Sequence, residues 1–169
     1  VVYGTNITVV PTINVNNGNI NYTVKDSEGN VVASGINAVD ENFTAMLAAG
    51  TYTVNATYSG NENYTDSTVI FNVTVNKANS TIVMDVDEVY VYNDLIVIKL
   101  KATGSSGVIN VVINGKVYPV TDDNEVVIER IAAGEYTIVA DLAADENFTD
   151  ASNSTAFKVE QAGTNVSID

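Results

Sequence analysis

The strongest constraint on this chain is that it repeats itself. The stretch AAGTYTV at 48–54 returns as AAGEYTI at 132–138, and the same spacing of 84 residues relates 47–78 to 131–162. Upstream of this region the spacing is 89, so that the segment beginning at Val2 matches the one beginning at Val91. The five-residue difference falls between about residues 25 and 46, where we expect one surface loop region. A fixed-distance repeat indicates two copies of one module.

The repeat divides the chain into two modules and a tail. We expect the first module over 1–77 and the second over 78–162, each large enough for a modest core. The second begins with an apolar segment, STIVMDVDE at 80–88, that has no counterpart in the first. The last residues, AGTNVSID at 162–169, align at a spacing of 84 with ANSTIVMD at 78–85. The sequence therefore predicts a first module without its first strand and, over 163–169, the first strand of a further repeat.

The local pattern is that of β-strands throughout. TYTVNATY at 51–58 alternates apolar and polar residues, as do IFNVTV at 70–75 and several segments of the second copy. The dipeptide Asn114-Gly115 predicts a two-residue type I′ hairpin turn, because both positions need positive φ. No apolar stripe has helical spacing. We therefore predict an all-β fold of tandem immunoglobulin-like antiparallel β-sandwiches with Greek-key connections and about seven strands per unit.

The two copies of the AAG-x-Y motif have the form of tyrosine corners. In immunoglobulin-type sandwiches, a tyrosine near the start of the sixth strand bonds backbone a few residues upstream, and a buried residue follows two positions later. Tyr52 and Tyr136 fit this pattern, and Gly50 and Gly134 are expected to allow a tight approach into the strand. The role predicted for all four residues is structural.

A second repeated motif follows the same strand in each copy. NENYTD at 61–66 returns as DENFTD at 145–150. We expect Tyr64 and Phe148 to fold their rings under the sandwich, and Asp66 and Asp150 to bond local backbone.

Composition excludes several classes of function. The chain has no Cys and no His, so thiol nucleophiles, Cys/His zinc sites and a Ser-His-Asp triad are absent. A net charge of −14 opposes binding to nucleic acids and to anionic membranes. The sequence shows neither a signal peptide nor an apolar run long enough to span a bilayer, so we expect a soluble piece of a longer protein without direct membrane insertion. An enzyme is the least favoured class.

The pattern AAGTYTVNATYSGNENYTDSTVIFNVTV resembles the bacterial Ig-like repeats, of the group 3 type, in large adhesin-like surface proteins, especially those of methanogenic archaea. Both copies fit the form G-x-Y-x-V-x-A-x-Y-x-G-x-x-N-Y, although the second has Leu142, Ala144 and Phe148 at three of its positions. The resemblance implies an Ig-like sandwich in a long extracellular stalk at the cell surface or cell wall, whose far end does the binding. The family motif contains no catalytic residues.

The outward faces are rich in glycosylation sequons. Ten Asn-x-Ser/Thr triplets begin at Asn6, Asn21, Asn42, Asn55, Asn63, Asn72, Asn79, Asn147, Asn153 and Asn165. They either mark a glycoprotein or follow automatically from strands that alternate Asn and Thr with apolar residues. Asn55, Asn63, Asn72 and Asn147 are our candidate glycosylation sites.

Other site chemistry is weakly supported. Asp85, Asp87 and Glu88 lie where the copies meet and are the candidates for an inter-repeat Ca²⁺ site, but their spacing matches no known calcium loop and acidic turn residues are usually solvated. Lys99, Lys101 and Lys158 alternate with inward apolar residues, so we expect no internal isopeptide crosslink. We predict no cofactor. Exposed Tyr90, Tyr92 or Tyr118 are the aromatic residues left for contact with a ligand.

The expected partners are neighbouring repeats of the same chain. Asn165 to Asp169 of one chain either completes the first module of another copy by head-to-tail strand exchange or packs on its own module. The predicted function is a spacer that presents a distal binding region for adhesion. The alternative is a module that itself binds a surface glycan or protein, and an exposed feature around 26–39 that the sibling lacks would favour it. The sequence names no ligand.

Overall fold

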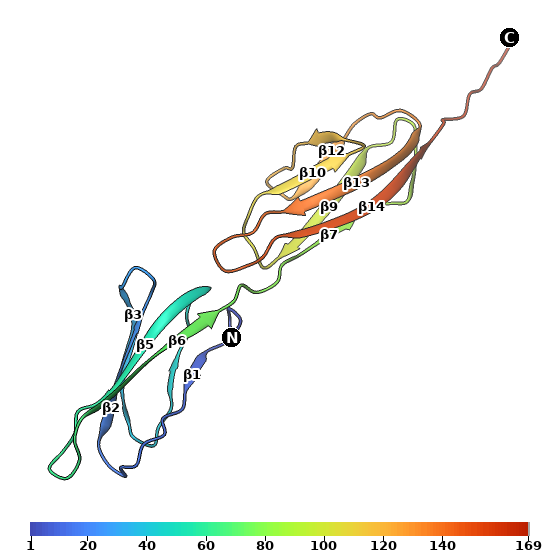
Figure 1. The fold of residues 1–169 in the computed structure, drawn as a ribbon. Helices are drawn as coiled ribbons and strands as arrows, with labels where there is room; N and C mark the ends of the chain where they lie inside the picture. Colours follow the sequence, from blue (N-terminus) through green and yellow to red (C-terminus); the bar gives the residue numbers. More distant parts are fainter. Residues whose placement is uncertain (169) are drawn as a thin grey trace. The chain divides into compact units, whose positions relative to one another are not determined.

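The computed structural model describes residues 1–168, and these contain strands and turns but no helix. The chain forms two compact units, Val1–Ala78 (unit 1) and Asn79–Asp169 (unit 2), and Figure 1 labels most of their strands. No described segment is a helix of the length and apolarity that crossing a bilayer would require. The all-β prediction is confirmed.

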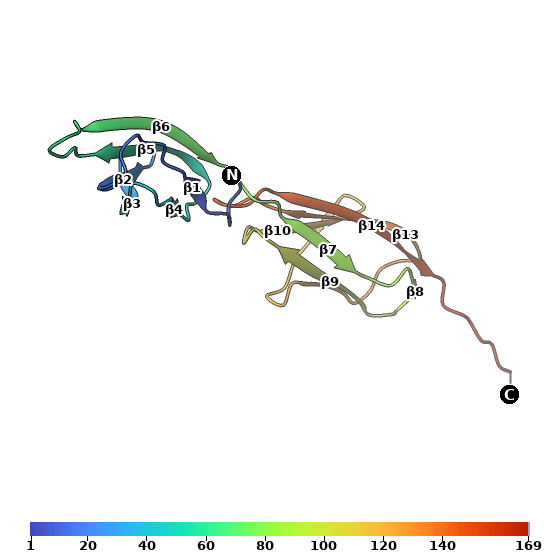
Figure 2. The same ribbon diagram turned by 90° about the horizontal axis from the view of Figure 1, so that it is seen from below.

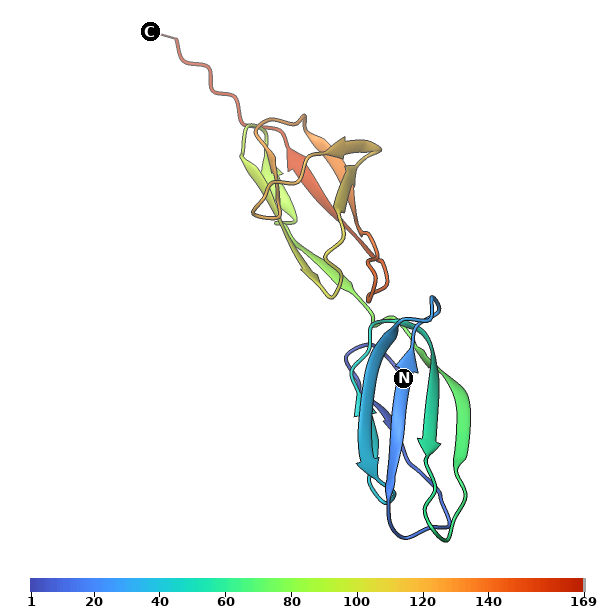
Figure 3. The same cartoon turned by 90° about the vertical axis from the view of Figure 1, so that its left-hand side faces the viewer.

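Unit 1 has six strands in two layers. Its strands are β1 (Ile7–Val9), β2 (Asn19–Lys25), β3 (Val31–Ala38), β4 (Phe43–Ala45), β5 (Gly50–Tyr58) and β6 (Ser67–Val75). The larger sheet has the order β3-β2-β5-β6, and Figure 3 shows these four strands side by side. The smaller sheet consists of β1 and β4 alone, paired antiparallel from Ile7↔Ala45 to Val9↔Phe43.

Unit 2 has eight strands. They are β7 (Thr81–Asp85), β8 (Val89–Val91), β9 (Ile96–Thr103), β10 (Ile109–Ile113), β11 (Lys116–Tyr118), β12 (Glu125–Ile128), β13 (Gly134–Leu142) and β14 (Ala151–Glu160). The larger sheet has the order β11-β10-β13-β14-β8, with β8 parallel to β14. The smaller sheet has the order β12-β9-β7, and β7 lies beside β9 in Figure 2.

Each unit encloses its own hydrophobic core, built from the inward positions of the alternating strands. In unit 1 the core includes Ile7 of β1, Val24 of β2 and Val54 of β5. In unit 2 it includes Ile98 of β9 and Ile138 of β13, both fully buried. Alternation along the strands places the polar residues of the same segments outside, as in β5, where Thr51 and Thr53 are exposed.

Turns occur where the sequence predicts them. Asn114 and Gly115 have φ of 47° and 82°, which confirms the hairpin turn between β10 and β11. The Asn114 side chain fixes this turn to the neighbouring strand, because its Oδ1 accepts the Thr137 N–H at 2.9 Å.

The strands of unit 1 have counterparts in unit 2 at the spacings of the sequence repeat. β5 and β13 begin at Gly50 and Gly134, 84 residues apart, while β1 and β9 begin at Ile7 and Ile96, 89 apart. The five-residue difference lengthens the β2–β3 hairpin, since β3 has eight residues and its counterpart β11 has three. Strand β7 has no counterpart among the described strands of unit 1.

The strand order of unit 2 is that of an immunoglobulin-like sandwich. One sheet holds the first, third and sixth strands, β7, β9 and β12, and the other holds β10, β11, β13 and β14. The chain crosses from the first sheet to the second between β7 and β8, where β8 joins the edge of β14 in parallel. The seven-strand antiparallel core with one parallel edge is an Ig-like arrangement.

Candidate functional site

Tyr52 and Tyr136 form equivalent corner bonds in the two units. The Tyr52 hydroxyl donates to the Ala48 carbonyl at 2.9 Å, and the Tyr136 hydroxyl donates to the Ala132 carbonyl at 2.8 Å. Each bond returns to backbone four residues upstream, which is the geometry of a tyrosine corner. The bond ties the loop before β5 or β13 to the start of that strand.

The glycines beside these tyrosines have ordinary surroundings. A Cβ added at Gly50 would lie 3.4 Å from the Tyr52 hydroxyl, and one added at Gly134 would lie 3.8 Å from the Tyr136 ring. Neither glycine has a positive φ. The tight approach expected from the sequence therefore does not require glycine at either position.

The loops 61–66 and 145–150 are held by their first residue. Asn61 Oδ1 accepts the N–H groups of Asn63 and Tyr64, at 2.8 and 2.9 Å. Asp145 Oδ1 accepts the equivalent N–H groups of Asn147 and Phe148, both at 2.9 Å. The prediction that Asp66 and Asp150 bond this backbone is therefore wrong. Asn61 and Asp145 are also Asx residues, and that residue type is the sequence signal for the observed bonds.

Asp145 also contacts Ser106, as its counterpart Asn61 contacts Asn17, the residue that aligns with Ser106 at a spacing of 89: the Asn61 side-chain N–H donates to the Asn17 Oδ1 at 3.4 Å. Its Oδ2 accepts the Ser106 N–H at 2.9 Å and the Ser106 hydroxyl at 3.2 Å. The Ser106 backbone N–H, followed by those of Asn147 and Phe148, lowers the pKa of Asp145 to about 2, because each bond favours the charged carboxylate.

The rings of Tyr64 and Phe148 differ in burial. Phe148 is half-buried, whereas Tyr64 is 42% exposed and does not fold under the sandwich as the sequence predicts. The difference in burial follows from the residue that faces each ring. In unit 2 this residue is Gly104, which leaves room for the Phe148 ring, because a Cβ added at Gly104 would lie 3.0 Å from the ring. The residue at the equivalent place in unit 1, 89 positions earlier, is Val15, which is itself buried.

The acidic residues proposed for calcium are not brought together. Asp85, Asp87 and Glu88 are all exposed, and the backbone N–H of Asp87 donates to the Tyr90 hydroxyl at 3.1 Å. Within residues 1–168, no three His, Cys, Asp or Glu side chains are grouped so as to hold a metal ion.

The candidate glycosylation sites differ in accessibility. Asn63 and Asn72 are exposed, whereas Asn55 and Asn147 are half-buried. Asn72 Oδ1 accepts the Thr53 hydroxyl across the β5–β6 pair at 3.1 Å, and Asn55 Oδ1 accepts the Thr57 hydroxyl at 3.0 Å. Asn153, in a further sequon, donates its side-chain N–H to the Ile82 carbonyl at 2.9 Å, so this amide is engaged inside unit 2.

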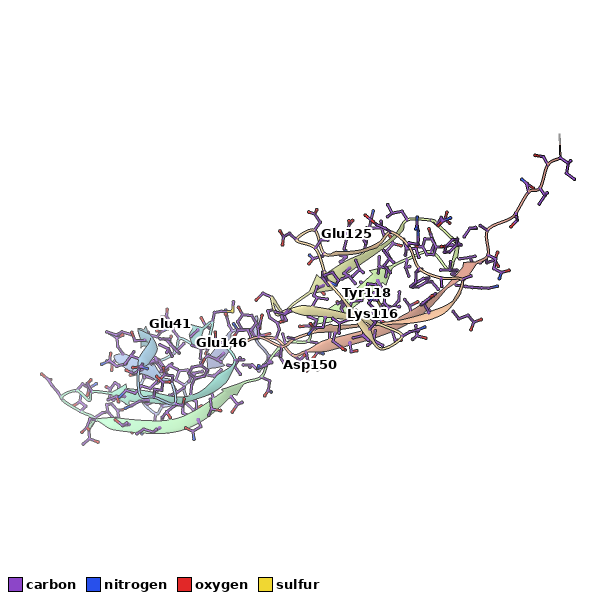
Figure 4. All side chains as sticks on the ribbon, turned by 90° about the horizontal axis from the view of Figure 1, so that it is seen from above. Glu41, Lys116, Tyr118, Glu125, Glu146 and Asp150 are labelled. Carbon is purple, nitrogen blue, oxygen red and sulfur yellow. The ribbon has the colours of Figure 1, made fainter. Side chains whose placement is uncertain are left out.

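Of the tyrosines considered for ligand contact, Tyr90 is buried and Tyr92 is exposed. Burial raises the pKa of Tyr90, whose ring packs edge-on against Phe157 at 5.7 Å. Tyr118 is half-buried on β11, and the Lys116 ammonium lies 5.0 Å from the centre of its ring. Figure 4 labels both residues. These tyrosines are spread over different strands and do not form one aromatic platform.

Unit 1 has a groove that is lined largely by apolar side chains. It has a volume of about 510 Å³ and runs between the segment 8–13, which follows from β1, and the outer strand β6. Its walls include Val9, Ile13, Tyr22, Val69 and Phe71. An adjoining hollow of about 630 Å³ continues it past Asn14 to Tyr64 and Thr65. The lining of neither hollow holds a pair of carboxylates suited to acid–base catalysis.

One residue that lines this groove carries a buried polar atom without a hydrogen-bond partner. The Tyr22 hydroxyl is, among the described residues, the sole buried side-chain oxygen or nitrogen that has no hydrogen bond. Its ring is 2% exposed and stacks on Phe43 with 4.8 Å between the ring centres. Burial raises the Tyr22 pKa, because the charged phenolate would lose its hydration.

No protein-family model matches the sequence, and no curated protein matches it significantly. Among solved structures, the chain is similar to the fibronectin(III)-like modules of Clostridium thermocellum CbhA, at 15% identity, TM-score 0.43, and coverage of 94% of this chain and 87% of that one. It is similar to an amphioxus IgVJ-C2 molecule at 11% identity and TM-score 0.43, covering 94% and 98% of the two chains.

A third similar structure is the BSP domain of a biofilm associated protein, at 20% identity and TM-score 0.30. The match covers 95% of this chain and 28% of that chain. At such identities and TM-scores, the assignment of an Ig-like fold rests on the strand order and on the two corner bonds.

Proposed function

We propose that the two units are spacer modules of an extracellular, adhesin-like cell-surface protein, and that they hold a distal binding region away from the cell. The proposal draws on the resemblance of the repeat motif to such proteins and on the architecture of the units. The groups inside each unit serve packing, and the acidic surface favours solubility rather than catalysis.

The observation that carries the proposal is where the chain enters and leaves unit 2. It enters beside the start of β14, where the Ser80 N–H donates to the Thr149 hydroxyl at 3.4 Å. It leaves after Glu160, the last residue of β14, which pairs with Val91. The ten residues of β14 span roughly 33 Å, so the unit carries the chain from one end of the sandwich to the other.

The parallel edge pair makes this path resistant to extension. The Lys158 N–H donates to the Glu88 carbonyl and the Tyr92 N–H to the Glu160 carbonyl, both at 2.8 Å. Unit 1 has a similar pair of bonds. The Tyr3 N–H donates to the Asn76 carbonyl, and the Asn76 N–H donates to the Val1 carbonyl, both at 2.8 Å. Tension applied through the ends of a unit pulls these strands along their axes, and the bonds of the pair are therefore loaded together.

Single-molecule stretching tests the spacer role. Unit 2 pulled through residues 79 and 162 should unfold at a markedly higher force than the same unit pulled through residues 115 and 162, because the second geometry peels the β10–β11 hairpin strand by strand. Equal forces in the two geometries would contradict a load-bearing role. Antibodies against this chain should label intact source cells, and label that appears only after permeabilisation would contradict the surface location.

A second candidate function rests on the β2–β3 hairpin, which distinguishes unit 1 from its sibling. β3 is an edge strand with Val31 57% exposed and Ile36 70% exposed. In this candidate, unit 1 itself binds a surface glycan or protein. Binding of the purified chain to cells or glycan arrays, lost when 26–36 is shortened to the length of the β10–β11 hairpin, would favour it over the spacer.

A further inference from the structure

We propose that the groove of unit 1 is an acceptor for an added β-strand, and that residues 164–168 of a second copy of this chain fill it and join the copies head to tail. This inference does not depend on the spacer function. It rests on the comparison of the groove with the place that β7 occupies in unit 2.

The groove lies where unit 2 has its first strand. In unit 2, β7 pairs antiparallel with β9, from Thr81↔Thr103 to Asp85↔Lys99. Moving the β9 segment 99–103 back by the repeat spacing of 89 gives 10–14 in unit 1. Residues 8–13 form one wall of the groove, and residues 12–15 line the adjoining hollow. Unit 1 therefore has a hollow where unit 2 has a strand.

The open edge of unit 1 retains its hydrogen-bonding groups. In unit 2, the Leu100 N–H donates to the Asn124 carbonyl at 2.9 Å, so Leu100 faces β12 while its neighbours Lys99 and Lys101 face β7. The counterpart of Leu100 is Pro11, and the counterparts of its neighbours are Val10 and Thr12. A proline has no N–H to donate, but here that donor would point away from the added strand.

The apolar side chains of the segment are incompletely covered. Val9, Pro11 and Ile13 are half-buried, whereas Ile98 and Leu100, the counterparts of the first two, are buried beneath β7 and its neighbours. Across the groove, Val69 of β6 is 56% exposed. Tyr22, whose buried hydroxyl has no hydrogen-bond partner, also lines this space.

The tail has a sequence similar to that of β7. At a spacing of 84, Val166 aligns with Ile82 and Ile168 with Met84, the inward residues of β7. Thr164 aligns with Ser80, whose hydroxyl accepts the Ser105 N–H at 2.9 Å. In the structure, residues 161–168 form no strand, and Val166 and Ile168 are 87% and 94% exposed (Figure 1). Asp169, the last residue of the aligned segment, lies outside the described residues.

Alternation along the tail provides a matched pair of variants. Val166 and Ile168 would point into the acceptor, while Asn165 and Ser167, like Thr81 and Val83, would point to solvent. V166D/I168D therefore puts two charges into the interface, and N165D/S167D adds the same charges outside it. Both changes fall on exposed residues, so the two units keep their fold.

The first measurement is solution mass by light scattering or sedimentation over about 1 μM to about 1 mM. The full chain should grow from 17.9 kDa toward multiples of that mass as its concentration rises. V166D/I168D should raise the concentration at half-association by about 100-fold or more, because it buries unpaired charge, whereas N165D/S167D should associate like the unaltered chain. A chain that remains monomeric throughout, or equal effects of the two variants, would overturn the proposal.

A mixing experiment tests the direction of the contact. T12P removes an N–H from the open edge of unit 1 and leaves the tail intact, so alone it should be monomeric, as should V166D/I168D. Mixed in equal amounts, the two should form a complex of twice 17.9 kDa that grows no further, because the one intact groove and the one intact tail meet only once. Absence of this complex, or assembly of T12P by itself, would overturn head-to-tail addition.

Discussion

The smaller sheets of the two units differ by one strand, and inward residues beside that strand differ in burial. In unit 2, β7 covers the edge of β9, and Ile98 is fully buried. In unit 1 the equivalent edge is uncovered, only Ile7–Val9 pairs as a strand, and Pro11 and Ile13 in its continuation are half-buried. The alternation of apolar residues is the same in both, so burial of an inward position depends on a neighbour supplied by a distant part of the chain.

The core of unit 1 partly compensates with larger side chains. Tyr22 corresponds to Val111 in unit 2, because each lies opposite an alanine of the neighbouring strand, Ala56 or Ala140. Phe43 corresponds to Val126, because the two lie opposite the aligned residues Val9 and Ile98. The two aromatic rings stack at 4.8 Å in the core of unit 1. A groove nevertheless remains, and the Tyr22 hydroxyl is left without a partner.

The strongest test of this comparison shortens the side chains of two aligned residues, Ile82 in β7 and Val166 in the tail. Ile82→Ala, in β7, should lower the unfolding free energy of unit 2 by about 3 kcal/mol, because it opens a cavity at a buried position. Val166→Ala, at the aligned exposed position, should change the unfolding free energy of the monomer by less than about 0.5 kcal/mol. Both are measured by denaturant unfolding followed by amide hydrogen exchange, and similar losses would show that the tail is already packed.

A second test of the comparison adds a copy of the β7 segment to unit 1 within the same chain. A copy of residues 78–89 fused before Val1 would place a β7 equivalent next to 10–14, and should raise the unfolding free energy of unit 1 by roughly 2 kcal/mol after the cost of ordering the added residues. A control fusion carrying Asp at the copied Ile82 and Met84 positions should give no gain. An equal gain from the control would mean that the groove is not a strand site.

The two corner tyrosines should respond unequally. Tyr52→Phe and Tyr136→Phe each remove one hydroxyl-to-carbonyl bond, for an expected loss of about 1 kcal/mol of unfolding free energy. The loss should be larger for Tyr52, which is buried, than for Tyr136, which is half-buried and bonded closer to water. Thermal unfolding of each variant measures the difference, and a larger loss at Tyr136 would contradict the argument from burial.

The unpaired hydroxyl of Tyr22 predicts a stabilising substitution. Tyr22→Phe should raise the unfolding free energy of unit 1 by about 1 kcal/mol, because it removes a buried polar atom that has lost its water. Tyr58→Phe is the matched control and should be destabilising, since the Tyr58 hydroxyl accepts the Asn61 side-chain N–H at 2.8 Å. Destabilisation by both would indicate that the Tyr22 hydroxyl has a partner in solution.

The smallest expected effect is a pH dependence confined to one loop. Asp145 has its pKa lowered from 3.8 to about 2, chiefly by the Ser106 N–H, so the carboxylate stabilises unit 2 fully above about pH 4 and progressively less as the pH falls toward 2. Asp145→Asn should flatten the acid limb of the unit 2 stability curve. Asn61, the equivalent residue in unit 1, does not titrate, so a variant at Asn61 should leave this limb unchanged.

Unit 1 has a separate acid-sensitive carboxylate. Asp26 accepts the side-chain N–H of Asn30 at 3.0 Å, and this bond, followed by backbone bonds in the same turn, lowers its pKa. Stability that depends on Asp26 is likewise lost as the pH falls below the ordinary carboxylate range. The Asp145→Asn measurement must therefore be read from amides of unit 2.

Sequence reasoning succeeded where a property is local. The period-two alternation, the positive-φ turn at Asn114-Gly115 and the repeat spacing concern residues close in the chain or copied along it, and they predicted the strands, the hairpin and the all-β class. It failed where two residues compete for one space: Tyr64 is exposed because Val15 lies where unit 2 has Gly104. It also assigned the loop bonds to Asp66 and Asp150, because several acceptors in one motif are equivalent until the loop geometry selects one.

The sequence by itself determined that this chain is made of alternating strands, that its halves follow one plan, and that the tail matches the first strand of unit 2. Only the tertiary structure decided that unit 1 has an open groove at the matching place, that Tyr22 is left unpaired there, and that Asp145 reaches Ser106. The physical reason is that burial and hydrogen bonding need two surfaces in contact. The second surface comes from a distant segment of the chain, and the local sequence pattern does not say which segment that is.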